Sequence, residues 1–168
     1  LDGTLEVCPW CLADGTAHRQ FPDAIMNDCD LVVQQQLQQQ SSHEQQEQPQ
    51  FGNCINNCVD GWNSNIIPKE AWHELMFQTP RFIAWQDTLW WTHCGDAAVY
   101  QGMGGWEEIQ AAGPAAAEYF LQYYMDEIRG SKETWEAFAR KTGKDYDRTA
   151  YLFSCRHCKA WGGYIDMK

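Results

Sequence analysis

Residues 8–15 have the sequence CPWCLADG, and residues 155–158 have the sequence CRHC. Each stretch holds two cysteines separated by two residues, which is the spacing at which a tight turn directs both thiolates at one tetrahedral metal ion. Two such pairs supply enough thiolates to close a structural zinc site. We therefore predict that one zinc ion joins the two ends of the chain, with the ligands Cys8, Cys11, Cys155 and Cys158.

A second ligand set stays open at this point. In it Cys155 and Cys158 bind the metal together with His93 and Cys94, and the first pair is left over or uses ligands outside this sequence. A third interpretation is that the cysteines are reduced, buried thiols, because free cysteine is among the most buried residue types.

The chain has eight cysteines, a number that also allows disulfides in an oxidising compartment. The two short-spaced pairs favour metal binding, and hence a reducing compartment. We expect the cytoplasm, with an organelle lumen as the alternative. The other four cysteines receive no assigned pairing: Cys29, Cys54, Cys58 and Cys94.

The composition limits the class of protein. The 168 residues suffice for one domain, and 12 basic against 23 acidic residues give a formal net charge of −11. Such a chain repels phosphate backbones, so we expect no nucleic-acid partner. No apolar run reaches the roughly 18 residues of a membrane-spanning helix. Nine tryptophans indicate a substantial core.

The order of elements predicts an α+β fold within a single domain, 1–168. Helices are expected at 68–78, at 114–129 and after Ser131, and strands at 150–153 and 163–165 flank the second cysteine pair. We expect a small zinc-ribbon-like β layer at the joined termini and an aromatic-rich helical middle. A Gln-rich, low-complexity insertion covers about 31–60. Periodicity does not decide between helix and strand for 82–92, and the glycines of 102–106 predict a turn with close backbone approach.

Residues 8–17, CPWCLADGTA, resemble the CPWCIADGSA signature of the CbrC-like proteins. The similarity continues in the same order through residues 74–75, 79–86, 90–98 and 150–158. The resemblance implies a mainly bacterial, largely uncharacterised family whose label refers to tolerance of a colicin, and it implies no enzymatic activity. It also implies a further cysteine cluster upstream of the CPWC block, which residues 1–7 do not contain.

His93, Cys94 and Asp96 are the candidate residues for an enzyme, in which a thiol or a bound metal would act. Adjacent residues on a strand point to opposite faces, so we expect His93 and Cys94 to be poorly placed as a catalytic pair. The leading prediction is a non-catalytic interaction or accessory protein with a structural zinc ion. The expected partner is another protein, alone or in a larger assembly, that meets an acidic surface bearing aromatic side chains.

Overall fold

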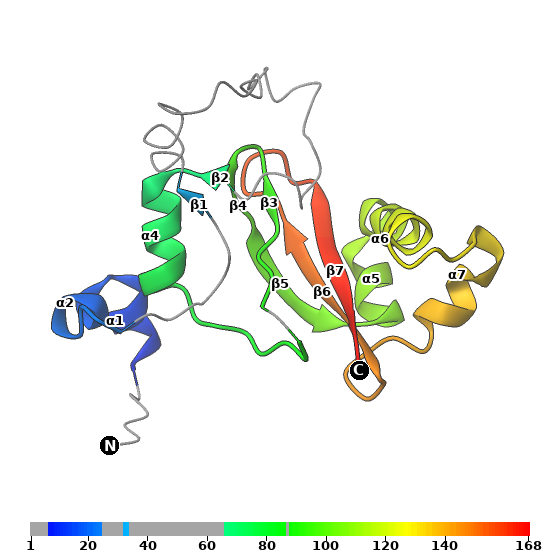
Figure 1. Ribbon diagram of the computed structural model, residues 1–168, viewed down its shortest axis with the longest axis horizontal. Helices are drawn as coiled ribbons and strands as arrows, with labels where there is room; N and C mark the ends of the chain where they lie inside the picture. The colour runs from blue at the N-terminus through cyan, green and yellow to red at the C-terminus, as the bar shows by residue number, and fades with distance from the viewer. Residues whose placement is uncertain (1–6, 25–31, 34–65, 87) are drawn as a thin grey trace, which may run out of the picture.

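The structure is a computed structural model that describes residues 7–24, 32–33, 66–86 and 88–168 (Figure 1). Nearly all of the predicted Gln-rich insertion lies outside the described residues, as do Cys29, Cys54 and Cys58. Within them the chain combines helices with antiparallel strands, which confirms the α+β class.

The elements follow one another in this order: α1 (Pro9–Ala13), α2 (Thr16–Gln20), β1 (Val32–Val33), β2 (Ile66–Ile67), α4 (Lys69–Gln78), β3 (Thr92–His93), β4 (Asp96–Ala97), β5 (Val99–Gly104), α5 (Trp106–Ala112), α6 (Pro114–Asp126), α7 (Lys132–Ala139), β6 (Arg148–Ser154) and β7 (Trp161–Met167).

The central sheet is antiparallel, in the order β5, β6, β7. Successive side chains of a strand point to opposite faces, and the middle strand β6 is apolar on both. Tyr151 and Phe153 join one core cluster with Trp91, whereas Ala150 and Leu152 join a second cluster. Figure 1 shows α5, α6 and α7 on one side of the sheet and α4 on the other. The sheet is therefore buried on both faces.

The segment between α4 and β3 brings tryptophans into the first cluster. Trp90 and Trp91 are buried, and the Trp91 indole lies where β7 has Gly162, whose missing side chain leaves room for the ring. Trp85 of the same segment is half-exposed. The core interpretation of these aromatic residues is thus correct for two of the three.

Local sequence signals account for most helix boundaries. Pro68 occupies the N-cap of α4, Pro114 begins α6, and Ser131 occupies the N-cap of α7, as predicted. Helix α2 ends at Gln20, before Phe21 and Pro22, because a proline disfavours the helical conformation of the residue that precedes it. The three helices expected from the sequence are confirmed.

Two expectations need correction. The turn predicted at 102–106 is confined to the end of that range, because Gly102 to Gly104 continue strand β5, with a register shift after Tyr100. The chain turns at Gly105, where an added Cβ would collide with the carbonyl of Thr142, so the predicted close backbone approach is present there. The segment 82–91 forms neither helix nor strand among its described residues.

Among the helices of the described chain, none has the length and apolar character needed to cross a membrane.

The carboxylate of Glu108 closes the first turn of α5, and its removal is our first test of the fold. The Gly105 N–H donates to Glu108 Oε2 at 2.8 Å, which satisfies a donor that a helix leaves unpaired. We expect Glu108→Ala to reduce the free energy of unfolding by about 1 kcal/mol in urea titrations at neutral pH. The matched control is Glu107→Ala in the same turn, and an equal loss in both variants would contradict this role.

The pH dependence of that loss follows from the pKa of Glu108. Hydrogen bonds from the backbone N–H groups of Gly105 and Glu108 lower this pKa below its ordinary value. A depressed pKa means that the stabilisation is present above the unfolded-state pKa and is lost as the pH falls through the folded-state pKa. The difference between the wild type and Glu108→Ala should therefore shrink in acid.

Candidate metal centre

The first half of the site is the tip of the hairpin formed by β3 and β4. His93 pairs with Asp96, so Cys94 and Gly95 are the two residues of the loop. Their φ angles are 54° and 68°, and a two-residue type I′ turn requires positive φ at both positions. Gly95 adopts such a conformation without steric cost, and Cys94 is carried into it with the turn.

This turn brings two adjacent side chains together. Cys94 Sγ lies 3.3 Å from His93 Nδ1, although neighbours on a regular strand point to opposite faces. The strand geometry behind the expectation that His93 and Cys94 are poorly placed as a catalytic pair therefore does not hold here, since their side chains lie side by side. The physical reason is the left-handed conformation of Cys94, which periodicity does not reveal.

The second half of the site is the turn between β6 and β7, which has the strand, Cys-x-x-Cys turn, strand order expected from the sequence. Cys155 N–H donates to the Ala160 carbonyl at 2.8 Å and closes the turn. The backbone N–H groups of His157 and Cys158 then point at Cys155 Sγ, at 3.4 and 3.5 Å. These two contacts fix Cys155 Sγ inside the turn.

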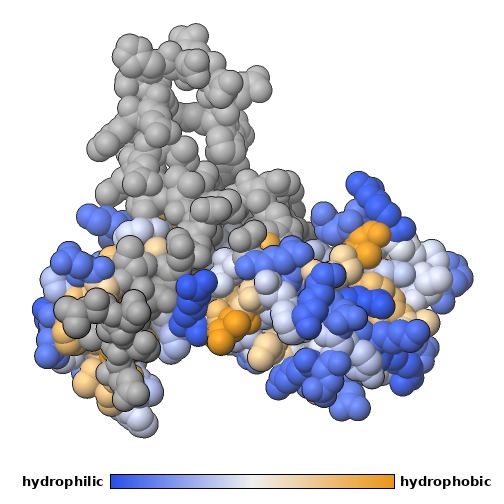
Figure 2. All heavy atoms as spheres, turned by 60° about the horizontal axis from the view of Figure 1, so that its bottom comes forward, coloured by the Kyte–Doolittle hydropathy of each residue, from blue (hydrophilic) through white to orange (hydrophobic). Residues whose placement is uncertain are grey.

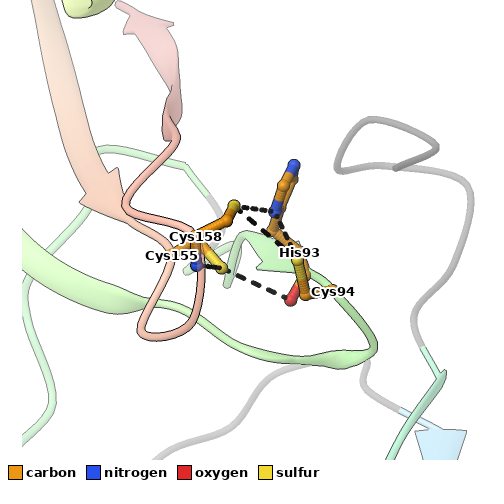
Figure 3. Close-up of side chains that lie close together, drawn as sticks. All are labelled: His93, Cys94, Cys155 and Cys158. Atoms are coloured by element: carbon orange, nitrogen blue, oxygen red, sulfur yellow. Dashed lines mark hydrogen bonds between the residues drawn. The ribbon is translucent and has the colours of Figure 1, made fainter. Parts of the chain in front are cut away.

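The two tips meet, and four ligand atoms converge (Figure 3). They belong to His93, Cys94, Cys155 and Cys158, and all lie within 4.8 Å of one another. Cys158 Sγ is 3.7 Å from Cys94 Sγ and 3.3 Å from His93 Nδ1. The sulfur separation far exceeds the roughly 2.05 Å of a disulfide, so these cysteines are thiols.

Cys8 and Cys11 are not part of this group. Cys8 precedes α1 and Cys11 lies within it, and neither ligand atom belongs to the convergent set found among the described residues. The joining of these two cysteines to Cys155 and Cys158 stays a prediction. The side-chain positions favour the second ligand set considered above, with His93 and Cys94 in their place.

A ring of polar contacts holds the two tips in register. Asp96 Oδ2, from the hairpin, lies 2.8 Å from His157 Nε2 and 3.8 Å from Arg156 Nε, both in the opposing turn. Arg156 also forms a two-pronged pair with Glu74 of α4, at 3.1 and 3.3 Å. The Glu74 carboxylate raises the pKa of Arg156 above its ordinary value. The Asp96 carboxylate thus links the hairpin tip to the opposing turn through its contact with His157. The sequence analysis did not identify His157 as its partner.

Burial differs among the four ligands. His93 is buried and stacks on the fully buried Trp91, with ring centroids 5.0 Å apart, while Cys155 is 1% exposed. Cys94 is half-buried and Cys158 exposed. Partial burial raises the pKa of the Cys158 thiol, but hydrogen bonds from the Ala160 backbone, Cys155 and Cys94 outweigh it, so the net pKa is lowered. The site is thus anchored in the core by His93 and Cys155, and Cys158 is its solvent-exposed ligand.

Substitution of Gly95 tests the left-handed turn conformation that places His93 and Cys94 side by side. An added Cβ would meet no atom within 4 Å, so only the positive φ opposes a side chain. We expect Gly95→Ala to cost about 1 kcal/mol of folding free energy in thermal unfolding, because left-handed backbone disfavours Cβ. Gly95→Asn, whose side chain tolerates this conformation, should cost clearly less. Equal melting temperatures for the two variants would argue against the turn.

The family model and the related proteins that the sequence matches all carry the same family designation. The model of an uncharacterised protein family, UPF0167, matches residues 2–167. UPF0167 proteins of Mycobacterium bovis and Mycobacterium tuberculosis are each 28% identical over 164 residues, which cover 96% of this chain and 68% of the relative. A UPF0167 protein of Pseudomonas aeruginosa is 25% identical over 152 residues, 90% of this chain and 65% of the relative. No solved structure matches.

Proposed function

The chain belongs to the uncharacterised protein family UPF0167, and from that premise we propose that it is a non-catalytic interaction protein whose fold is fastened by a structural zinc ion. The ligands would be His93, Cys94, Cys155 and Cys158. The proposed compartment is the cytoplasm, where thiols stay reduced. The resemblance to CbrC-like proteins is compatible with this proposal and adds no role to it.

The spacing of the donor atoms is the observation that carries the proposal. Zinc binds sulfur at about 2.3 Å and nitrogen at about 2.0 Å in a tetrahedron, so two sulfur ligands lie about 3.8 Å apart and sulfur and nitrogen about 3.5 Å apart. The corresponding distances here are 3.7 Å between Cys94 and Cys158, and 3.3 Å from His93 Nδ1 to each of these sulfurs. Three cysteines and one histidine are also a ligand set typical of structural zinc.

The architecture around the ligands supports a zinc-ribbon-like centre. Two hairpin tips, one at 93–96 and one at 155–158, each supply two ligands and face each other. Four protein ligands complete the tetrahedron and leave no position for water or substrate, so such an ion stabilises rather than catalyses. Cys155 and His93 are 62 positions apart in sequence, so the ion would also close a long loop of the unfolded chain.

One distance favours the enzyme alternative, the 3.3 Å between Cys94 Sγ and His93 Nδ1. A Cys–His nucleophile needs a histidine nitrogen that serves one thiol and a third group that orients the ring. Here the same nitrogen lies equally close to Cys158 Sγ, and the Asp96 carboxylate contacts His157. These contacts suit a shared metal better than a catalytic pair.

Metal removal is the direct test of this proposal. Purified protein should hold one zinc ion per chain, and a strong chelator should lower the melting temperature markedly, because structural zinc contributes on the order of 10 kcal/mol to folding. Cys158→Ser, at an exposed ligand, should lose the metal while the chain still folds at low temperature. Cys8→Ser is the control and should keep one ion. Zinc lost from Cys8→Ser and kept in Cys158→Ser would refute this ligand set.

The proposed partner surface lies where the segment after α4 crosses the end of β7. Ile83 is 84% exposed and Trp85 47% exposed, and the Gln86 side chain donates to the Met167 carbonyl at 2.8 Å. The N–H groups of Trp85 and Gln86 donate to Asp166 Oδ2, at 2.9 and 3.0 Å, which fixes the segment against the sheet. Figure 2 shows small hydrophobic areas on a mainly hydrophilic face of the molecule. A fixed, exposed apolar area is typical of a protein contact.

Site-specific photo-crosslinking tests this surface. A crosslinker at position 83 should join the chain to one discrete protein in cells, and Trp85→Ser should reduce the yield several-fold. A crosslinker at Glu118, on the exposed side of α6, is the matched control and should give no such product. The same product from both positions, or a yield unchanged by Trp85→Ser, would show that the segment is not the contact.

A further inference from the structure

One sulfur of the candidate metal centre is open to solvent. Cys158 is exposed, whereas His93 and Cys155 are buried beneath it. A dissolved reagent that reaches the centre therefore meets Cys158 first. A cysteine that binds zinc does so as a thiolate, and the thiolate is also the form that reacts with oxidants. The same sulfur thus holds the ion and is accessible to an oxidant.

The turn that carries Cys158 is basic in a chain whose net charge is −11. Arg156 lies two positions before this cysteine and Lys159 one position after it. Arg156 is paired with Glu74 and Asp96, and the Lys159 ammonium donates to the Arg156 carbonyl at 2.9 Å, which holds it against the turn. Partly exposed, electropositive surroundings are typical of reactive cysteines and not of inert, buried ones.

A second sulfur lies beside Cys158, on the opposing hairpin tip. Cys94 Sγ is 3.7 Å from Cys158 Sγ (Figure 3). A disulfide bond is about 2.05 Å long, so an approach of less than about 2 Å would bring these sulfurs to bonding distance. Cys155 is the less suitable partner, because it is buried and its Sγ accepts the N–H groups of His157 and Cys158, at 3.4 and 3.5 Å.

On the basis of the proposed zinc centre, we propose that hydrogen peroxide replaces the ion by a disulfide between Cys94 and Cys158. The Cys158 thiolate attacks one peroxide oxygen, so the O–O bond breaks, a sulfenic acid forms and hydroxide leaves. The Cys94 thiolate then attacks Cys158 Sγ, forms the disulfide and expels a second hydroxide. The two cysteines lose two electrons and the peroxide gains them. His93 and Cys155 remain, half of a tetrahedral site, so the zinc ion leaves.

This disulfide would keep the two hairpin tips together after the ion has left. It would join residues 64 positions apart and so restrict the unfolded chain, as the ion does. The contact of Asp96 with His157 lies outside the bond and is unaffected by it. The oxidised chain should therefore stay folded and melt at a higher temperature than the reduced chain from which a chelator has removed zinc. Dithiothreitol and zinc should restore the original centre.

Trypsin separates the three cysteines of the centre, so peptide mapping identifies the bond that forms. Cys94 falls in the peptide 82–129, Cys155 in 149–156 and Cys158 in 157–159, each with a single cysteine. The full, zinc-loaded chain, treated with hydrogen peroxide and then with a maleimide, should give 82–129 joined to 157–159, with one zinc ion released per bond. A bond between 149–156 and 157–159, or zinc release without the expected bond, would overturn the proposal.

The zinc content before and after peroxide separates this switch from the zinc centre on which it rests. A chain that binds no zinc before peroxide is added would contradict both. A chain that binds zinc and keeps it, with both thiols still open to the maleimide after denaturation, would contradict the switch alone.

Two histidine variants test the roles of the sulfurs, because histidine also binds zinc. Cys158→His should hold zinc and release it to peroxide several-fold more slowly than the wild type. Cys94→His should hold zinc, and its oxidation should stop at a Cys158 sulfenic acid that dimedone labels on the peptide 157–159. Release at the wild-type rate from Cys158→His, or peptides without the label in Cys94→His, would contradict these roles.

A charge variant that leaves every ligand in place gives an independent check. Lys159→Gln should keep one zinc ion and release it to peroxide several-fold more slowly, because the sulfur loses its positive neighbour. The matched control is Lys132→Gln, at an exposed lysine of α7, which should react at the wild-type rate. Equal rates in the two variants would show that the basic turn does not promote the oxidation.

Discussion

The meeting of two hairpin tips is the constraint on which the rest of the structure depends. One tip offers His93 and Cys94 and the other offers Cys155 and Cys158, and their donor atoms converge within 4.8 Å. Three thiols and an imidazole at this spacing could hold a metal ion. The polar contacts of Asp96 with His157 and Arg156 bring the same two tips together from outside the donor set. Two features of the fold therefore position the donor atoms: the backbone turns that carry them, and the polar contacts of Asp96 that hold the two tips together.

The core transmits this constraint to the sheet. His93 stacks on Trp91, and Trp91 packs against Gly162 of β7, the strand that follows the second tip. Displacement of the first tip would therefore disturb the packing beneath the second. Helix α4 is coupled to the same place through Glu74 and Arg156. A net charge of −11 destabilises the compact state through self-repulsion. The ion pair of Arg156 with Glu74 opposes this repulsion locally.

Local signals made much of the fold predictable, and non-local pairing set the limit. Proline and serine at helix starts placed α4, α6 and α7, and the short apolar stretches on either side of the second cysteine pair placed β6 and β7. The choice of ligands for Cys155 and Cys158 was not fixed, because spacing shows which residues form a pair and not which pairs meet. The left-handed backbone at Cys94, which spacing does not reveal, goes with a Cys94 Sγ that lies 3.7 Å from Cys158 Sγ. The turn was predicted to begin at Gly102, but a glycine within a strand marks an irregularity of strand pairing as readily as a turn.

X-ray absorption at the zinc edge tests the central claim most directly, because sulfur and nitrogen ligands differ in distance, at about 2.3 and 2.0 Å. We expect a first shell of three sulfurs and one nitrogen in the full chain, with the nitrogen contribution lost in His93→Cys. A shell of four sulfurs in the unsubstituted protein would show that the two Cys-x-x-Cys pairs share the ion. A shell of oxygen and nitrogen alone would contradict a thiolate centre altogether.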